Sequence, residues 1–154
     1  MNYKKVLIVK FDIEGSHNWP AAPDRHKILK SEHQHIFHFE VEVDVVQSDR
    51  EIEFLDFRRE MIQLVYTMYN AEETQLNLFK EDLEYQVGSD IPIRIPRLLF
   101  GARSCEMIAE DIIASVNTEW NTQLRSVTVM EDAFVGARLQ IDELEYVMSH
   151  LIGP

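Results

Sequence analysis

The stretch SEHQHIFHFEVEVDV, residues 31–45, decides how this chain folds. Successive side chains of a β-strand point to opposite faces of a sheet. His33 and His35 therefore continue the face that the chain turns toward its core, which carries Phe37, Phe39, Val41, Val43 and Val45. A buried imidazole without a hydrogen-bond partner costs about 1–3 kcal/mol. Both histidines thus need a partner, which can be a backbone carbonyl, a carboxylate or a metal ion.

The flanking segments place this strand in an α+β domain that spans residues 1–154. Alternating apolar residues predict a first strand that begins near residue 6 and ends near Gly15, and a second strand over 33–47. Two prolines predict a loop over 18–32 between them. Apolar spacing then changes to a helical period, which predicts a helix capped by Asp56 that ends near Asn70.

The second half of the chain is predicted to contain an extended arm, a second helix, a hairpin and a short C-terminal helix. Residues 89–103 contain two Ile-Pro pairs and are predicted to form an extended arm. Ser104 is the expected N-cap of a second helix. Residues 124–132 and 134–141 are predicted to pair as a hairpin, and Asp142 with Glu145 to begin a short C-terminal helix.

Composition narrows the classes of function. The chain has 27 acidic and 15 basic residues and a formal net charge of −12, so nucleic acid is not an expected partner. An anionic substrate would need a metal ion or local Arg and Lys side chains. No apolar run has the length of a membrane span or a signal segment. A single cysteine, Cys105, fits a reducing compartment, so we expect a cytoplasmic protein.

The pair His33 and His35 is a candidate metal site, because two imidazoles on one face of a strand can share an ion. His17 is the natural third ligand if the first two strands pair, and His26 in the loop is its competitor. Three neutral imidazoles would leave a tetrahedral zinc ion one open position. The alternative is that these are partly buried histidines whose only partners are hydrogen bonds.

Several short motifs occur in an order that resembles the 6-pyruvoyl- and 6-carboxytetrahydropterin synthases. They are FDIEGSH at 11–17, HQH at 33–35, EFLDF at 53–57, QLN at 75–77, SCEMIAEDI at 104–112 and VTVMEDAFVGA at 127–137. The resemblance implies a tunnelling fold, with ββααββ order, a four-stranded antiparallel sheet and two helices on one face. It also implies a ring-like homohexamer with active sites between subunits.

The same resemblance implies a zinc ion bound by His17, His33 and His35, and 7,8-dihydroneopterin triphosphate as substrate. Glu106 and Glu131 correspond to the glutamates that bind the pterin ring. A carboxylate suits that ring, since it accepts two parallel hydrogen bonds from an N–H and an amino group. Without a ligand, Glu106 would be an acid favoured by a helix dipole and Glu131 a solvated turn residue.

The chain differs from this family at the positions of the family's catalytic residues. The loop before His33 has no cysteine, and Glu72 and Glu73 replace the family's Asp-His pair. Cys105, in the first turn of a helix, and Glu32, next to His33, are the candidate bases. Cys105 has a third interpretation, as a small apolar residue packed under its helix.

Three functions therefore remain open. The first is a zinc-dependent lyase that forms a 6-substituted tetrahydropterin, like the 6-carboxytetrahydropterin synthase of the deazapurine (queuosine) pathway. The second is a non-catalytic homologue that binds zinc and a pterin or purine. The third is a ring-forming scaffold protein.

Overall fold

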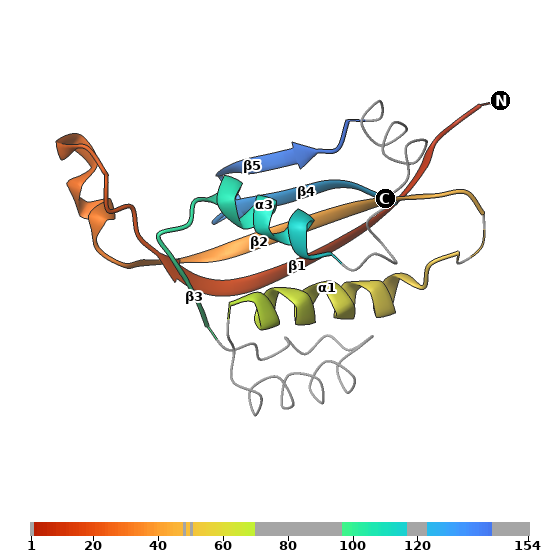
Figure 1. Ribbon diagram of the computed structural model, residues 1–154, viewed down its shortest axis with the longest axis horizontal. Coiled ribbons are helices and arrows are strands. Elements are labelled where there is room, and N and C mark those ends of the chain that lie inside the picture. The colour runs from red at the N-terminus through yellow and green to blue at the C-terminus, as the bar shows by residue number, and fades with distance from the viewer. Residues whose placement is uncertain (1, 48, 50, 70–96, 117–122, 143–154) are drawn as a thin grey trace.

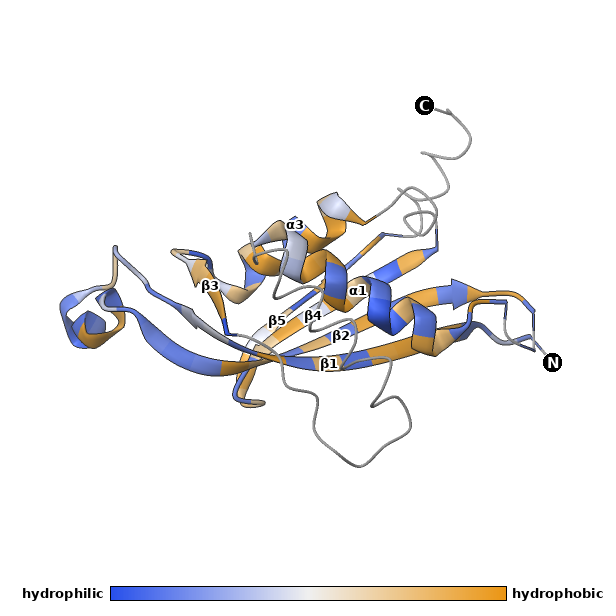
Figure 2. Ribbon diagram, turned by 90° about the horizontal axis from the view of Figure 1, so that it is seen from below, coloured by the Kyte–Doolittle hydropathy of each residue, from blue (hydrophilic) through white to orange (hydrophobic). Residues whose placement is uncertain are grey.

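The centre of the fold is a five-stranded sheet with the strand order β3-β1-β2-β4-β5. The computed structural model describes residues 2–47, 49, 51–69, 97–116 and 123–142. The elements along the chain are β1 (Lys5–His17), the 3-10 helix η1 (Asp24–Lys30), β2 (His33–Val45), α1 (Phe54–Met68), β3 (Leu98–Gly101), α3 (Cys105–Ser115), β4 (Leu124–Glu131) and β5 (Val135–Gln140). The two α-helices that the structure describes, α1 and α3, lie on one face of the sheet (Figure 1, Figure 2).

The two longest strands pair over their whole length. Antiparallel β1 and β2 run in register from Lys5 opposite Val45 to His17 opposite His33. The alternation read from the sequence is confirmed, since Phe37, Phe39, Val41 and Val43 are buried in the core. The first strand ends at His17 rather than near Gly15, and the second ends at Val45 rather than at residue 47. The extra length of the first strand brings His17 into the sheet.

The helices follow the predicted apolar spacing, with one correction at a cap. The cap of α1 is Glu53, whose carboxylate accepts a hydrogen bond from the backbone N–H of Asp56, so Asp56 lies in the first turn. Ser104 caps α3 as predicted and accepts a bond from the N–H of Met107. The buried residues of the two helices face the sheet and complete the core, namely Phe57, Met61, Ile62, Val65, Tyr66, Cys105, Ile108, Ala109 and Ile112.

The sheet has one more strand than predicted. β3 pairs in parallel with β1 beside Gly15, Ser16 and His17. It lies in the segment that the two Ile-Pro pairs predict as an extended arm, and its four residues are too short a run to give a periodic signal. Phe100 of β3 packs where Gly15 has no side chain, since a Cβ on Gly15 would lie 2.3 Å from the ring.

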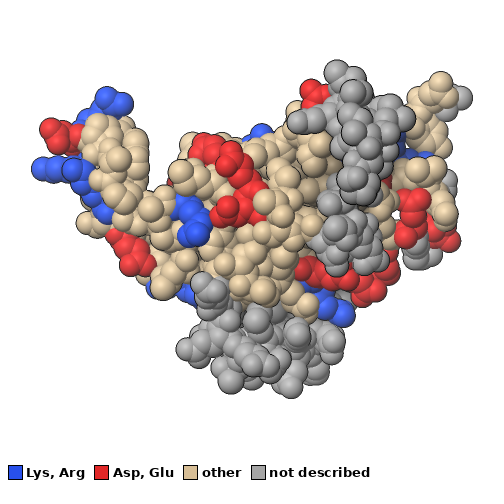
Figure 3. All heavy atoms as spheres, in the orientation of Figure 1, with Lys and Arg blue, Asp and Glu red and all other residues tan. Residues whose placement is uncertain are grey.

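The loop between β1 and β2 leads directly from His17 to His33 and projects away from the sheet (Figure 1). It exposes Arg25, Lys27 and Lys30, which form a local group of positive charges on an acidic chain (Figure 3). These cations lie at the same end of β1 and β2 as the histidines.

Some predictions lie outside the described residues. They are the helix that follows Asp142, the motif at 75–77 and the replacement of the Asp-His pair at 72–73. Among the helices that the structure describes, none is long and apolar enough to cross a membrane.

Candidate metal centre

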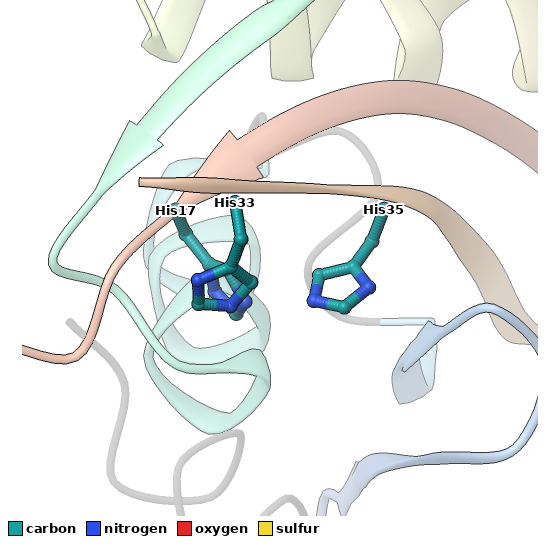
Figure 4. Close-up of side chains that lie close together, drawn as sticks. All are labelled: His17, His33 and His35. Atoms are coloured by element: carbon teal, nitrogen blue, oxygen red, sulfur yellow. The ribbon is translucent and has the colours of Figure 1, made fainter. Parts of the chain in front are cut away.

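Three histidines converge at the end of β1 and the start of β2 (Figure 4). His17 lies opposite His33 in the register, and His35 lies opposite Gly15. The ring centroids are 4.6 Å apart for His17 and His33, 5.2 Å for His17 and His35, and 4.9 Å for His33 and His35. One nitrogen from each ring lies within 4.8 Å of the others. The three rings could therefore hold a metal ion.

Each ring is oriented by a hydrogen bond to its other nitrogen. Nδ1 of His17 lies 2.9 Å from the carbonyl oxygen of Arg103, and Nδ1 of His33 lies 2.9 Å from that of Ser31. Nδ1 of His35 lies 2.6 Å from a carboxylate oxygen of Asp132. Because all three partners are acceptors, each Nδ1 carries a hydrogen and each Nε2 is left for another partner. Metal-binding histidines are held in this way.

The residues present fit a bound zinc ion. Nε2 of His35 is buried and makes no hydrogen bond, although a carboxylate oxygen of Glu131 lies 3.5 Å away. A buried polar atom without a hydrogen bond is costly unless a ligand binds it. The donors are three imidazole nitrogens, which suit zinc and leave a coordination position for water or substrate. Phe37, which is fully buried, packs edge-on against His17 and His35.

Glu131, the last residue of β4, lies against this centre. Its carboxylate oxygens are 3.1 Å from Nε2 of His17 and 3.5 Å from Nε2 of His35. The hydrogen bond from His17 lowers the pKa of Glu131, so this carboxyl is ionised at neutral pH. Burial disfavours protonation of His17, but hydrogen bonds to Glu131 and the Arg103 carbonyl outweigh it and raise the pKa of His17. A proton would thus compete with a metal ion for Nε2 of His17.

Cys105 contacts this group as a neutral thiol. Its sulfur lies 3.7 Å from a carboxylate oxygen of Glu131, to which it donates. Burial, followed by the charges of Glu131 and Glu106, raises the pKa of Cys105 to about 12. The position in the first turn of α3 favours a thiolate, but burial and the two carboxylates outweigh it. The thiol is thus a hydrogen-bond donor at neutral pH, which disfavours its predicted role as a base.

The other predicted site residues do not reach the histidines within one chain. The carboxylate of Glu32 accepts a hydrogen bond from Ser16, whose register partner is Gln34, on the sheet face opposite the histidines. Glu106 is exposed on the first turn of α3. His26 stacks on Trp19 in the loop, with ring centroids 6.2 Å apart, so the third member of the cluster is His17.

Sequence reasoning missed Asp132, which binds His35. In the motif MED at 130–132 only the glutamate is a predicted site residue, although an Asp in a tight turn often forms local hydrogen bonds. A surface pocket of about 210 Å³ adjoins His35 and Asp132. Its other lining residues are Glu14, Gln34, Ile36 and Arg97.

Comparison with known proteins supports the fold. No family model matches the chain, and no curated protein matches its sequence. Among solved structures, 6-pyruvoyl tetrahydropterin synthase from Caenorhabditis elegans superposes with a TM-score of 0.52 at 11% identity, covering 91% of this chain and 97% of that one. An uncharacterized protein from Wolinella succinogenes superposes with a TM-score of 0.56 at 10% identity, covering 92% and 100%. The chain therefore has the tunnelling fold that its motif order predicted.

Proposed function

We propose that this chain is a zinc-dependent lyase that converts 7,8-dihydroneopterin triphosphate to a 6-substituted tetrahydropterin, as 6-carboxytetrahydropterin synthases do in the deazapurine (queuosine) pathway. The observation that carries the proposal is the convergence of three oriented imidazoles beside the ionised Glu131. This pairs a candidate metal centre with a candidate pterin anchor, on the fold of a tetrahydropterin synthase.

The residues have separate roles in this proposal. His17, His33 and His35 would hold the ion, which supplies Lewis-acid polarisation of a hydroxyl or carbonyl oxygen of the substrate. Glu131 would accept two hydrogen bonds from the pterin ring. Cys105 donates to Glu131 and so orients the carboxylate. Arg25, Lys27 and Lys30, in the loop between β1 and β2, offer positive charge for the triphosphate.

The site is proposed to be completed by a second subunit of a homohexamer. β3 and β5 are the edge strands of the described sheet, and such edges are available for pairing with another chain. Sedimentation of the purified protein tests the assembly, and a stable monomer at micromolar concentration would exclude it.

A second candidate is a homologue that binds zinc and a pterin or purine without turnover. The positions of the candidate bases favour it, since Glu32 lies with Ser16 and the Cys105 thiol is neutral. Neither of these two groups is placed to take a proton beside the histidines in the described part of one chain. A scaffold protein would need neither the oriented rings nor the carboxylate beside them.

One experiment separates these functions. The zinc-loaded protein is incubated with dihydroneopterin triphosphate, and products are identified by mass spectrometry, with the His35→Ala protein as the matched control. A tetrahydropterin formed only by the wild type supports the lyase. Calorimetric binding of the substrate without product supports the binding homologue. Absence of both product and binding would refute both.

A further inference from the structure

We infer that Asp132 is a positioning residue that holds His35 in the orientation required for metal binding and thereby raises the metal affinity of the centre. The inference rests on the metal centre of the proposed function. It assigns a role to a residue outside the three histidines and next to the predicted pterin anchor, Glu131.

Asp132 is attached to β2 at three points. One carboxylate oxygen lies 2.6 Å from Nδ1 of His35, and the other accepts a bond of 3.0 Å from the backbone N–H of Ile36. The backbone N–H of Asp132 donates to the carbonyl oxygen of Ile36 at 2.9 Å. Because both carboxylate oxygens are engaged with consecutive residues of β2, the carboxylate is fixed and the imidazole ring cannot rotate without losing a charge-assisted hydrogen bond.

The turn that carries Asp132 has an unusual backbone. Asp132 and Ala133 both have positive φ angles, 50° and 63°, and the N–H of Phe134 bonds to the carbonyl oxygen of Glu131 at 3.1 Å. Asp tolerates this conformation, whereas Ala pays about 1–2 kcal/mol. Such strain persists where the surrounding structure imposes it, and it concentrates at functional sites. Here the strained turn directs the Asp132 carboxylate back onto β2.

His35 differs from the other two histidines in the hydrogen-bond partner of its Nδ1. Nδ1 of His17 and Nδ1 of His33 bond to backbone carbonyls, which no substitution can remove. Nδ1 of His35 bonds to a side chain. A carboxylate partner fixes the tautomer and makes the opposite nitrogen a stronger ligand. That opposite nitrogen is the buried Nε2 without a hydrogen-bond partner.

The inference is tested with Asp132→Asn and Asp132→Gly, since both residues tolerate a positive φ and neither keeps the carboxylate. Zinc affinity is measured by competition with a chromophoric chelator, and the visible spectrum of the cobalt-substituted protein reports ligand geometry. We expect zinc to bind about 10–100-fold more weakly to both variants, the usual effect of removing such a partner. The cobalt bands should shift.

Asp12→Asn is the matched control. The carboxylate of Asp12 lies 2.6 Å from Nδ1 of His38, the same type of contact at a histidine outside the cluster. Its zinc affinity should stay within about twofold of the wild type, because no ligand loses a partner. Circular dichroism establishes whether each variant is folded. If the Asp132→Asn protein does not fold, the test relies on the Asp132→Gly protein.

The outcomes are distinct. Folded Asp132 variants with wild-type zinc affinity and cobalt spectra would overturn the role of Asp132 and leave the metal centre standing. An equal loss of affinity in Asp12→Asn would overturn it too, because removal of any negative charge would then be the cause. A wild-type chain that binds no zinc would overturn the proposed metal centre together with this inference.

Discussion

Replacing Gly15 by alanine is the most direct test of the packing beneath the histidines. Gly15 lies opposite His35 in the register, and an added Cβ would lie 2.3 Å and 2.7 Å from two ring atoms of Phe100 and 3.1 Å from Phe37. Both rings are fully buried, so neither can move without disturbing its neighbours. We therefore expect Gly15→Ala to destabilise the fold.

The magnitude follows from two opposing contributions. Overpacking of a core costs about 1–3 kcal/mol, while exchanging Gly for Ala in a strand recovers about 0.5–1 kcal/mol of backbone entropy. The free energy of unfolding should thus fall by about 0.5–2 kcal/mol, and the melting temperature by several degrees, at about 2–4 °C per kcal/mol for a domain of this size. Urea titration followed by circular dichroism measures the loss.

A double-mutant cycle identifies the cause. In a Phe100→Leu background the clash is relieved, so Gly15→Ala should cost about 1 kcal/mol less than in the wild type. Gly136→Ala is the control, since its Cβ would meet the backbone oxygen of Val129 at 2.2 Å and should cost the same in both backgrounds. An equal cost of Gly15→Ala with and without the Phe100 ring would refute the packing described here.

Three further predictions concern the residues around the centre. Ala133→Gly should raise the free energy of unfolding by about 0.5–1 kcal/mol, because relief of the positive φ of Ala133 exceeds the entropy cost of Gly. An unchanged urea midpoint would contradict a strained backbone at Ala133. Ala102→Gly is the control, since Ala102 is exposed and has no positive φ. Cys105 should resist a thiol reagent at pH 8 until the protein unfolds, because a pKa of about 12 leaves a thiolate fraction on the order of 10⁻⁴. Rapid labelling of the folded protein would contradict this prediction. Glu131→Gln should weaken pterin binding in calorimetry by about 1.5–3 kcal/mol, since a donor replaces one acceptor of a charged hydrogen bond, and unchanged affinity would remove Glu131 as the anchor.

The sequence predicted four of the five strands and the grouping of three histidines because both follow from local periodicity. Strict alternation places His33 and His35 on one face, and pairing of two consecutive strands is the simplest way to bring a third histidine beside them. The capping of α3 by Ser104 was likewise predicted, because serine is a preferred N-cap residue. The assignment of ligand roles to His17, His33 and His35 also needed the family resemblance.

The features that the sequence did not predict depend on contacts between residues that are distant in the chain. The short β3 has too few residues for a periodic signal and exists because Phe100 fills the space beside Gly15. Burial of Cys105 and its contact with Glu131 come from the packing of α3 against β4, which no local pattern encodes. The side of the sheet to which Glu32 turns depends on its bond to Ser16.

Zinc analysis of the purified protein tests the central claim most directly. Elemental analysis after dialysis against trace zinc should find about one zinc ion per chain in the wild type, and the His17→Ala and His35→Ala proteins should lose it. A His26→Ala protein should keep it, because His26 lies outside the cluster. Folded His17→Ala and His35→Ala proteins that retain full zinc, or a wild type that binds none, would contradict the account.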